Sequence, residues 1–161
     1  MLISFFVGII AFIWLRKGRI KGTSFISLPL LAFYLSFVLT ITIISRIPSI
    51  TVQYNFIPFW SYKAIFSGEV KLIAQVFWNV VLFIPIGILL MLFLTAKYKS
   101  VIAFFLSLLF SSSIEVIQLV TRRGLFEFDD IVHNSLGAII GIGLYYFVRL
   151  FVKRLIPQNK L

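Results

Sequence analysis

The chain consists largely of long apolar runs that end at charged residues, glycine or proline. Five such runs cover residues 1–15, 25–45, 73–96, 101–121 and 131–152. At about 1.5 Å per residue, each of the last four is long enough to cross a hydrocarbon core of about 30 Å. The first is marginal and either spans with local thinning of the bilayer or lies in the interface. The pattern predicts an all-α integral membrane protein, a bundle of about five transmembrane helices with a short first one.

The segment between the second and third runs, residues 46–71, lacks the pattern of a membrane span. Pro48, Pro58 and Gly68 interrupt it, and aromatic residues are frequent between positions 54 and 66. Aromatic side chains of this kind concentrate at the headgroup level of a bilayer. We expect a stiff interfacial loop on the external side. No internal repeat or linker divides the chain, so residues 1–161 are predicted to form one membrane domain.

Composition supports a bilayer as the solvent of this chain. Hydrophobic residues make up 61% and charged residues 12%, and the mean hydropathy is +1.09. A soluble domain of this size could not bury so much apolar surface. The net charge of +10 comes from basic residues at the ends of apolar runs, which indicates topology signals and not a nucleic-acid partner. The absence of cysteine excludes disulfides, zinc–thiolate sites and a catalytic thiol.

The basic residues also predict an orientation. None precedes the first apolar run, and the cluster RKGRIKG follows it. This order is the reverse of a secretory signal and favours a retained first helix with its N-terminus outside. Ten basic residues then lie on the cytoplasmic side and five on the external side, with the C-terminus inside. If the first run does not span, the other four still place residues 46–71 outside.

Polar and small residues form a stripe on each of three predicted helices. On the fourth run, spacings of 4, 4, 3 and 4 relate Ser107, Ser111, Glu115, Gln118 and Arg122. On the fifth run, spacings of 4, 3, 4 and 4 relate Asp130, Asn134, Gly137, Gly141 and Tyr145. The third run carries Gln75, Asn79 and Gly87 on one face. Such spacings align residues along a helix, and polar stripes do not suit lipid, so the three helices should face one another.

Four of the five acidic residues lie in one window, at positions 115, 127, 129 and 130. Counted from the predicted external ends, Glu115 and Asn79 lie roughly 9 Å deep and Asn134 roughly 5 Å deep. An ionised group in the bilayer core costs about 2.5–3.5 kcal/mol, so Glu115 must be paired, hydrated or protonated. Arg122 lies about two turns along the helix and could reach back to it.

One connected polar cavity that opens outward is therefore expected, with the residue 46–71 loop partly covering it. Its predicted lining is Asn79, Glu115, Gln118, Asp130 and Asn134, with Arg122 and His133 at the rim beside Asp130. The alternative for the single carboxamides is ordinary interhelical hydrogen bonding, and for Gly137 and Gly141 close helix packing. His133 taken alone reads as an interface histidine. No metal-ligand, nucleophile or phosphate-loop motif is present, so neither a metal nor a cofactor is expected.

Four stretches resemble the signature of the VanZ-like family: YNFIPF (54–59), NVVLFIPIG (79–87), EVIQ (115–118) and EFDDIVHNSLGAIIG (127–141). The resemblance spans residues 55–143. The matching positions are Asn55, Pro58, Phe59, Asn79, Phe83, Pro85, Gly87, Glu115, Gln118, Asp130, Asn134 and Gly137. Glu127 stands where the family usually has Asp, which keeps the charge and lengthens the side chain by one methylene.

The resemblance implies a bacterial cell-membrane protein associated with low-level resistance to teicoplanin and related lipoglycopeptides. Together with the stripes it gives the binding candidates Asn55, Asn79, Glu115, Gln118, Arg122, Glu127, Asp130, His133 and Asn134. One hypothesis is a binding protein that engages a lipid-linked envelope component, such as a wall precursor, or the antibiotic. The other is a membrane-embedded enzyme that modifies an envelope lipid, with Glu115 or Asp130 as acid–base or metal ligand. The lack of an established catalytic motif favours the first. A small transporter is less favoured because no inverted repeat is detectable.

Overall fold

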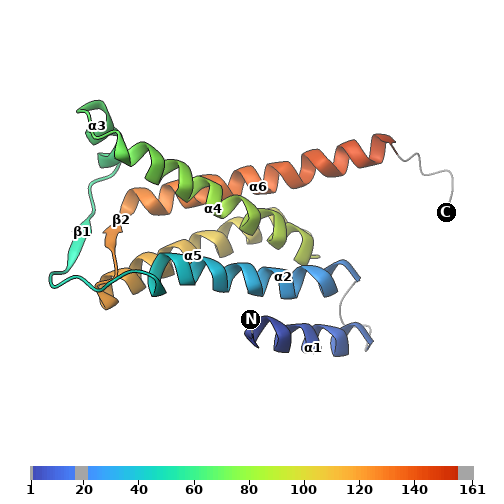
Figure 1. Cartoon of the computed structure of the whole chain (residues 1–161). Coiled ribbons are helices and arrows are strands. Elements are labelled where there is room, and N and C mark those ends of the chain that lie inside the picture. The colour runs from blue at the N-terminus through green and yellow to red at the C-terminus, as the bar shows by residue number, and fades with distance from the viewer. Residues whose placement is uncertain (1, 17–21, 156–161) are drawn as a thin grey trace.

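The structure is a computed structural model that describes residues 2–16 and 22–155, and most of these residues are helical (Figure 1). The elements in chain order are α1 (Leu2–Arg16), α2 (Gly22–Leu39), the π-helical turn η1 (Thr40–Ile44), β1 (Gln53–Asn55), α3 (Trp60–Phe66), α4 (Lys71–Phe93), α5 (Lys99–Thr121), β2 (Leu125–Glu127) and α6 (Phe128–Leu155).

Four helical segments are long and apolar enough to cross a membrane: Ser24–Ile44, Lys71–Phe93, Lys99–Thr121 and Phe128–Leu155. They correspond to the four long apolar runs of the sequence, so a multi-pass membrane protein is confirmed. The short first run forms α1, which has 15 residues and a length of about 22 Å, less than a hydrocarbon core of about 30 Å. It contacts α2 and lies alongside it in Figure 1.

Helices α4 and α6 form the tightest pair of the bundle, because glycines let their backbones approach each other. A Cβ atom added at Gly137 would lie 2.1 Å from the carbonyl oxygen of Val80, and one added at Gly141 would lie 2.1 Å from that of Ile84. At Gly87 the same atom would lie 2.3 Å from the carbonyl oxygen of a residue on α6. These glycines therefore serve close helix packing, which was the simpler interpretation of the sequence.

The loop between α2 and α4 is more ordered than the sequence predicted. It contains the short helix α3 and the strand β1, which pairs in parallel with β2 so that Asn55 faces Glu127. Both strands and α3 lie at one end of the bundle (Figure 1). An all-α fold is thus correct for the membrane-spanning part, while a two-stranded sheet at this end was not predicted. We call this end of the bundle the sheet end.

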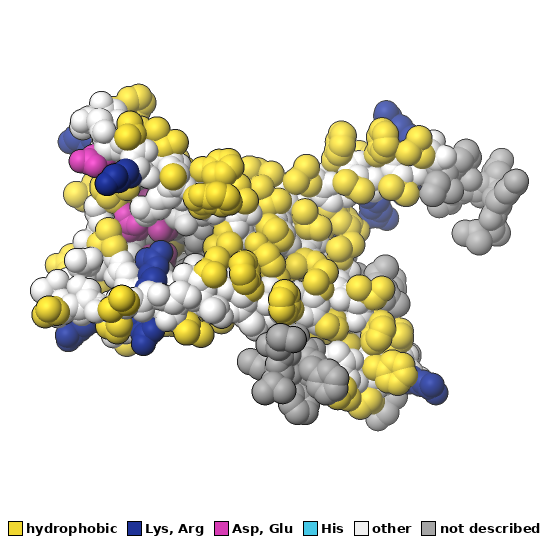
Figure 2. All heavy atoms as spheres, viewed as in Figure 1, with side chains coloured by type: hydrophobic (Ala, Val, Ile, Leu, Met, Phe, Trp, Pro, Cys, Tyr) yellow, Lys and Arg dark blue, Asp and Glu magenta, His cyan; other side chains and the backbone are white. Residues whose placement is uncertain are grey.

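The charges divide between the ends of the molecule. Figure 2 shows acidic side chains only at the sheet end, basic side chains at both ends, and an apolar band between them. All five acidic residues of the chain belong to the sheet end, at positions 69, 115, 127, 129 and 130. The apolar band, with exposed side chains such as Phe105 and Leu109, is the surface expected against lipid.

Candidate functional site

A layer of buried and half-buried polar side chains lies at the sheet end, where α4, α5, β2 and α6 meet. We call it the polar layer. It consists of Gln75 and Asn79 on α4, Ser111 and Glu115 on α5, Glu127 on β2, and Asp130, His133 and Asn134 on α6. Glu115, Glu127, His133 and Asn134 are each at most 5% exposed. The structure thus brings most of the predicted site residues together from four segments.

Glu115 joins α5 to the strand that precedes α6. Its carboxylate is 2% exposed, and its Oε2 atom accepts a hydrogen bond of 2.9 Å from the backbone N–H of Glu127. The side chain thus points into the bundle and not into lipid, as the stripe on the fourth apolar run predicted.

Glu127 and Asp130 share one donor, the side-chain amide of Gln75. The Nε2 atom of Gln75 donates to Oε2 of Glu127 and lies 3.4 Å from Oδ1 of Asp130. Burial, and after it the negative charge of Asp130, raise the pKa of the Glu127 carboxyl to about 7, although the hydrogen bond from Gln75 opposes the rise. A group with such a pKa exchanges protons near neutral pH.

Asn134 and Gln118 are used differently, although both were predicted to line the cavity. Asn134 donates from Nδ2 to the hydroxyl oxygen of Ser111 at 2.9 Å, inside the polar layer. Gln118 donates to the backbone carbonyl of Thr42 at 3.0 Å. That carbonyl belongs to the end of η1, where a helix leaves carbonyls without intrahelical partners. Gln118 therefore fastens α5 to η1.

His133, which was expected at the rim of the site, is buried beneath α3. The residue is 1% exposed, and its Nε2 atom lies 3.0 Å from the hydroxyl of Tyr62 on α3. Its Nδ1 atom lies 3.9 Å from Oδ1 of Asp130, too far for a hydrogen bond. Helix α3 belongs to the residue 46–71 loop, which was expected to cover part of the site.

Three polar atoms of the layer are buried without a hydrogen-bond partner among the described residues. They are Nδ2 of Asn79, Nδ1 of His133 and Oδ1 of Asn134. Buried polar atoms in folded proteins are nearly always paired, and an unpaired one costs free energy. These atoms, next to two buried carboxylates, are therefore the positions from which the layer would hold a polar group of a ligand.

Asp129 organises the cover of the polar layer and was missed as a site residue. It is 1% exposed and accepts hydrogen bonds from the backbone N–H of Phe59 at 2.5 Å and of Ser61 at 2.9 Å. The Ser61 hydroxyl also donates to it, at 2.5 Å. Adjacent residues on a helix point about 100° apart. The pair Asp129–Asp130 could therefore have shown that only one of the two faces the layer.

The family-like stretch YNFIPF shapes the loop that carries α3. Oδ1 of Asn55 accepts a hydrogen bond of 3.0 Å from the backbone N–H of Ile57, which forms a local turn. Phe59 has φ 60°, in the left-handed region that bulky residues rarely adopt. The bond to Asp129 holds this conformation at the start of α3. Asn55 was predicted to bind a ligand, and the structure places it in a turn beside the layer.

The arginines after α5 fasten the loop and do not reach the acids. Arg122 is exposed and donates to the carbonyl oxygen of Ile50 at 3.4 Å, so it does not turn back to Glu115 as the sequence suggested. Arg123 donates to the carbonyl oxygen of Ile44 at 3.0 Å. The cation beside the layer is Arg46, whose charge acts on both Glu115 and Glu127.

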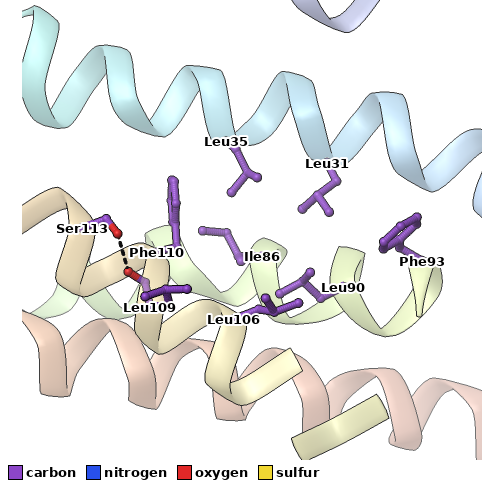
Figure 3. A pocket seen from close by; sticks show the side chains of 9 residues that line it. All are labelled: Leu31, Leu35, Ile86, Leu90, Phe93, Leu106, Leu109, Phe110 and Ser113. Atoms are coloured by element: carbon purple, nitrogen blue, oxygen red, sulfur yellow. Dashed lines mark hydrogen bonds between the residues drawn. The ribbon is translucent and has the colours of Figure 1, made fainter. Parts of the chain in front are cut away.

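An apolar cavity of about 370 Å³ lies among α2, α4 and α5 (Figure 3). Leu31 and Leu35 point into it from α2, and Ile86 and Leu90 from α4. Along α5 it ends at Ser113, two residues before Glu115. Its lining suits a hydrocarbon chain.

Comparison with known families decides what kind of protein this is. The family model VanZ/LLP1 matches residues 25–150. The chain belongs to the VanZ/LLP1 family. The resemblance seen in the sequence is thus confirmed. The matched part of this VanZ/LLP1 protein contains the whole polar layer, its α3 cover and the apolar cavity. Helix α1 lies outside the matched part. Neither a curated protein nor a solved structure matches the chain.

Proposed function

We propose that this VanZ/LLP1 protein confers low-level resistance to teicoplanin and related lipoglycopeptides in the bacterial cell membrane. It does so by binding a lipid-linked envelope component or the antibiotic itself in the polar layer. The observation that carries the proposal is the set of buried polar atoms on Asn79, His133 and Asn134 that have no hydrogen-bond partner among the described residues, in the layer that also holds the carboxylates of Glu115 and Asp130. Intramembrane acids are rarely kept for packing alone.

The chemistry of the polar layer and of the apolar cavity favours a ligand with a polar head and a hydrocarbon tail. Carboxylates and the Asn134 carbonyl accept hydrogen bonds, so the layer suits a head group rich in hydroxyl, amide or amine donors. The apolar cavity of about 370 Å³ lies among α2, α4 and α5 and suits the tail. Lipid-linked wall precursors and lipoglycopeptides both combine such a head with such a tail.

The proposed orientation places the polar layer on the outer side, where both ligands occur. Among the described residues, the opposite end of the bundle carries Arg16, Lys97, Lys99, Arg149, Lys153 and Arg154 and no acidic residue. Basic residues in short loops concentrate on the cytoplasmic side. This distribution supports a cytoplasmic C-terminus and an external α3.

Expression in a susceptible bacterium tests the proposal through the minimum inhibitory concentration. The wild-type chain should raise it for teicoplanin and not for a glycopeptide without an acyl tail. Glu115→Gln and Asp130→Asn keep the side-chain shapes and remove the charges, so both should return the value to that of the empty vector at equal protein levels. Glu69→Gln is the matched control, because Glu69 is an exposed acid at the same end. Full protection by both amide variants would refute a role for the charges.

An enzyme acting on an envelope lipid is the second candidate, and one observation favours it. The raised pKa of Glu127, about 7, suits a general acid or base, with Glu115 and Asp130 adjacent. Mass spectrometry of lipids from expressing and non-expressing cells separates the candidates. An enzyme predicts a lipid of altered mass that disappears with Glu127→Gln, whereas a binding protein predicts an unchanged lipid profile together with resistance.

A further inference from the structure

A second pocket lies at the end of the bundle opposite the polar layer, between the end of α4 and α6. It has a volume of about 360 Å³, and its polar lining comes from Thr95, Lys99, Tyr145 and Arg149. The Lys99 ammonium donates to the carbonyl oxygen of Met91 at 3.1 Å and to the Tyr145 hydroxyl at 2.8 Å. An ammonium has three donors, so Lys99 is held in place with one donor to spare, and Arg149 is exposed beside it.

An apolar groove adjoins this pocket along the outer faces of α4 and α6. Its volume is about 430 Å³, and it is lined by Ile88, Leu92, Leu144, Val148 and Val152, with Arg149 and Lys153 at its edge. The groove and the pocket share the lining residues Leu92, Tyr145 and Arg149. A cationic pocket thus opens directly onto an apolar groove at the level where the helices leave the apolar band.

The charged side chains described at the end of the bundle that holds this pocket are all basic. All five acidic residues of the chain lie at the sheet end. The described residues at the pocket end of the bundle include five cations and no Asp or Glu: Lys97, Lys99, Arg149, Lys153 and Arg154. Basic pockets between transmembrane helices attract anionic head groups, and each cation near the membrane surface contributes measurably.

We propose that this groove is a binding site for an anionic phospholipid. The phosphate lies against Lys99 and Arg149, the Tyr145 hydroxyl donates to the head group, and one acyl chain follows the groove past Val148. The site is separate from the polar layer, and its occupancy does not depend on the function proposed for that layer.

Native mass spectrometry of the purified full-length protein in detergent tests the site. The probes are phosphatidylglycerol and phosphatidylcholine with identical acyl chains, and glycerol phosphate as a soluble head group. We expect the protein to retain phosphatidylglycerol in preference to phosphatidylcholine, and glycerol phosphate not to displace it. Arg149→Gln should lower phosphatidylglycerol retention by about fivefold, the contribution of one surface cation. Arg154→Gln removes the same charge from the same helix outside the lining and should leave retention within about twofold.

A second pair of variants tests the groove. Val148→Trp fills it, and Phe147→Trp places the same side chain on an adjacent exposed position outside the lining. Val148→Trp should lower retention of phosphatidylglycerol, whereas Phe147→Trp should not. Equal retention of the two lipids, equal effects of Arg149→Gln and Arg154→Gln, or equal effects of the two tryptophan variants would each overturn the proposal. Displacement by glycerol phosphate would instead show a site for free phosphate.

Discussion

Replacement of Asp129 by Ala should release α3 from the polar layer while the transmembrane helices stay folded. The variant removes the acceptor of three hydrogen bonds, from the Phe59 N–H, the Ser61 N–H and the Ser61 hydroxyl. Hydrogen bonds to a charged acceptor contribute about 1.5–3 kcal/mol each, and water replaces part of this when the loop opens. The same bonds hold Phe59 in a left-handed conformation that costs about 1–3 kcal/mol.

We therefore expect the closed state of the loop to lose about 3–5 kcal/mol, which raises the opening equilibrium by a factor of about 10²–10⁴. Hydrogen–deuterium exchange in detergent measures this directly. The amides of Phe59 and Ser61 should exchange faster by that factor in Asp129→Ala, and peptides from α5 should keep their wild-type protection. Glu69→Ala, which removes an exposed acid near α3, should change neither. Unchanged exchange at 59–61 in Asp129→Ala would refute the view that this carboxylate holds the cover.

Three further outcomes follow from the structure. Gly137→Ala places a Cβ atom 2.1 Å from the Val80 carbonyl oxygen and should destabilise the protein by about 1–3 kcal/mol in detergent melting. The control is Gly143→Ala, whose Cβ atom meets nothing within 4 Å and which should leave the stability unchanged. The pKa of Glu127 is raised from 4.5 to about 7, so between these pH values the folded state binds a proton that the unfolded state has lost. Stability should therefore fall as pH rises from about 4.5 to 7. Glu127→Gln should flatten that part of the melting profile. Ser67 is exposed, and the chain contains no cysteine. Ser67→Cys should therefore react with a membrane-impermeant thiol reagent in intact cells. Reaction only after lysis would reverse the predicted topology.

The features that the sequence predicted correctly are those set by local periodicity. Apolar runs of 21 residues or more gave the four long helices, because a bilayer demands that length. The spacing of Glu115 and Asn134 along their helices predicted that both side chains would be buried, because only one face of each helix avoids lipid. The glycines on α4 and α6 were likewise visible as a packing interface.

The features that the sequence did not predict depend on contacts between distant segments. Strand β1 has three residues and pairs with β2 about 70 positions later, and so short a strand carries no periodic signal. The role of Asp129 depends on where α3 docks. Arg122 takes a left-handed conformation at the end of α5 (φ 57°), which ends the helical stripe on which its reach to Glu115 was based. Arg46 lies next to the acids because it follows η1, which contacts α5.

An experimental density map of the protein purified from bacterial membranes would show whether the polar layer holds a ligand or serves packing alone. We expect non-protein density within about 3.5 Å of Nδ2 of Asn79, Nδ1 of His133 and Oδ1 of Asn134, next to the Glu115 carboxylate. A map in which these atoms pair with other side chains of the protein, with no room between α4, α5 and α6 for another group, would contradict this expectation.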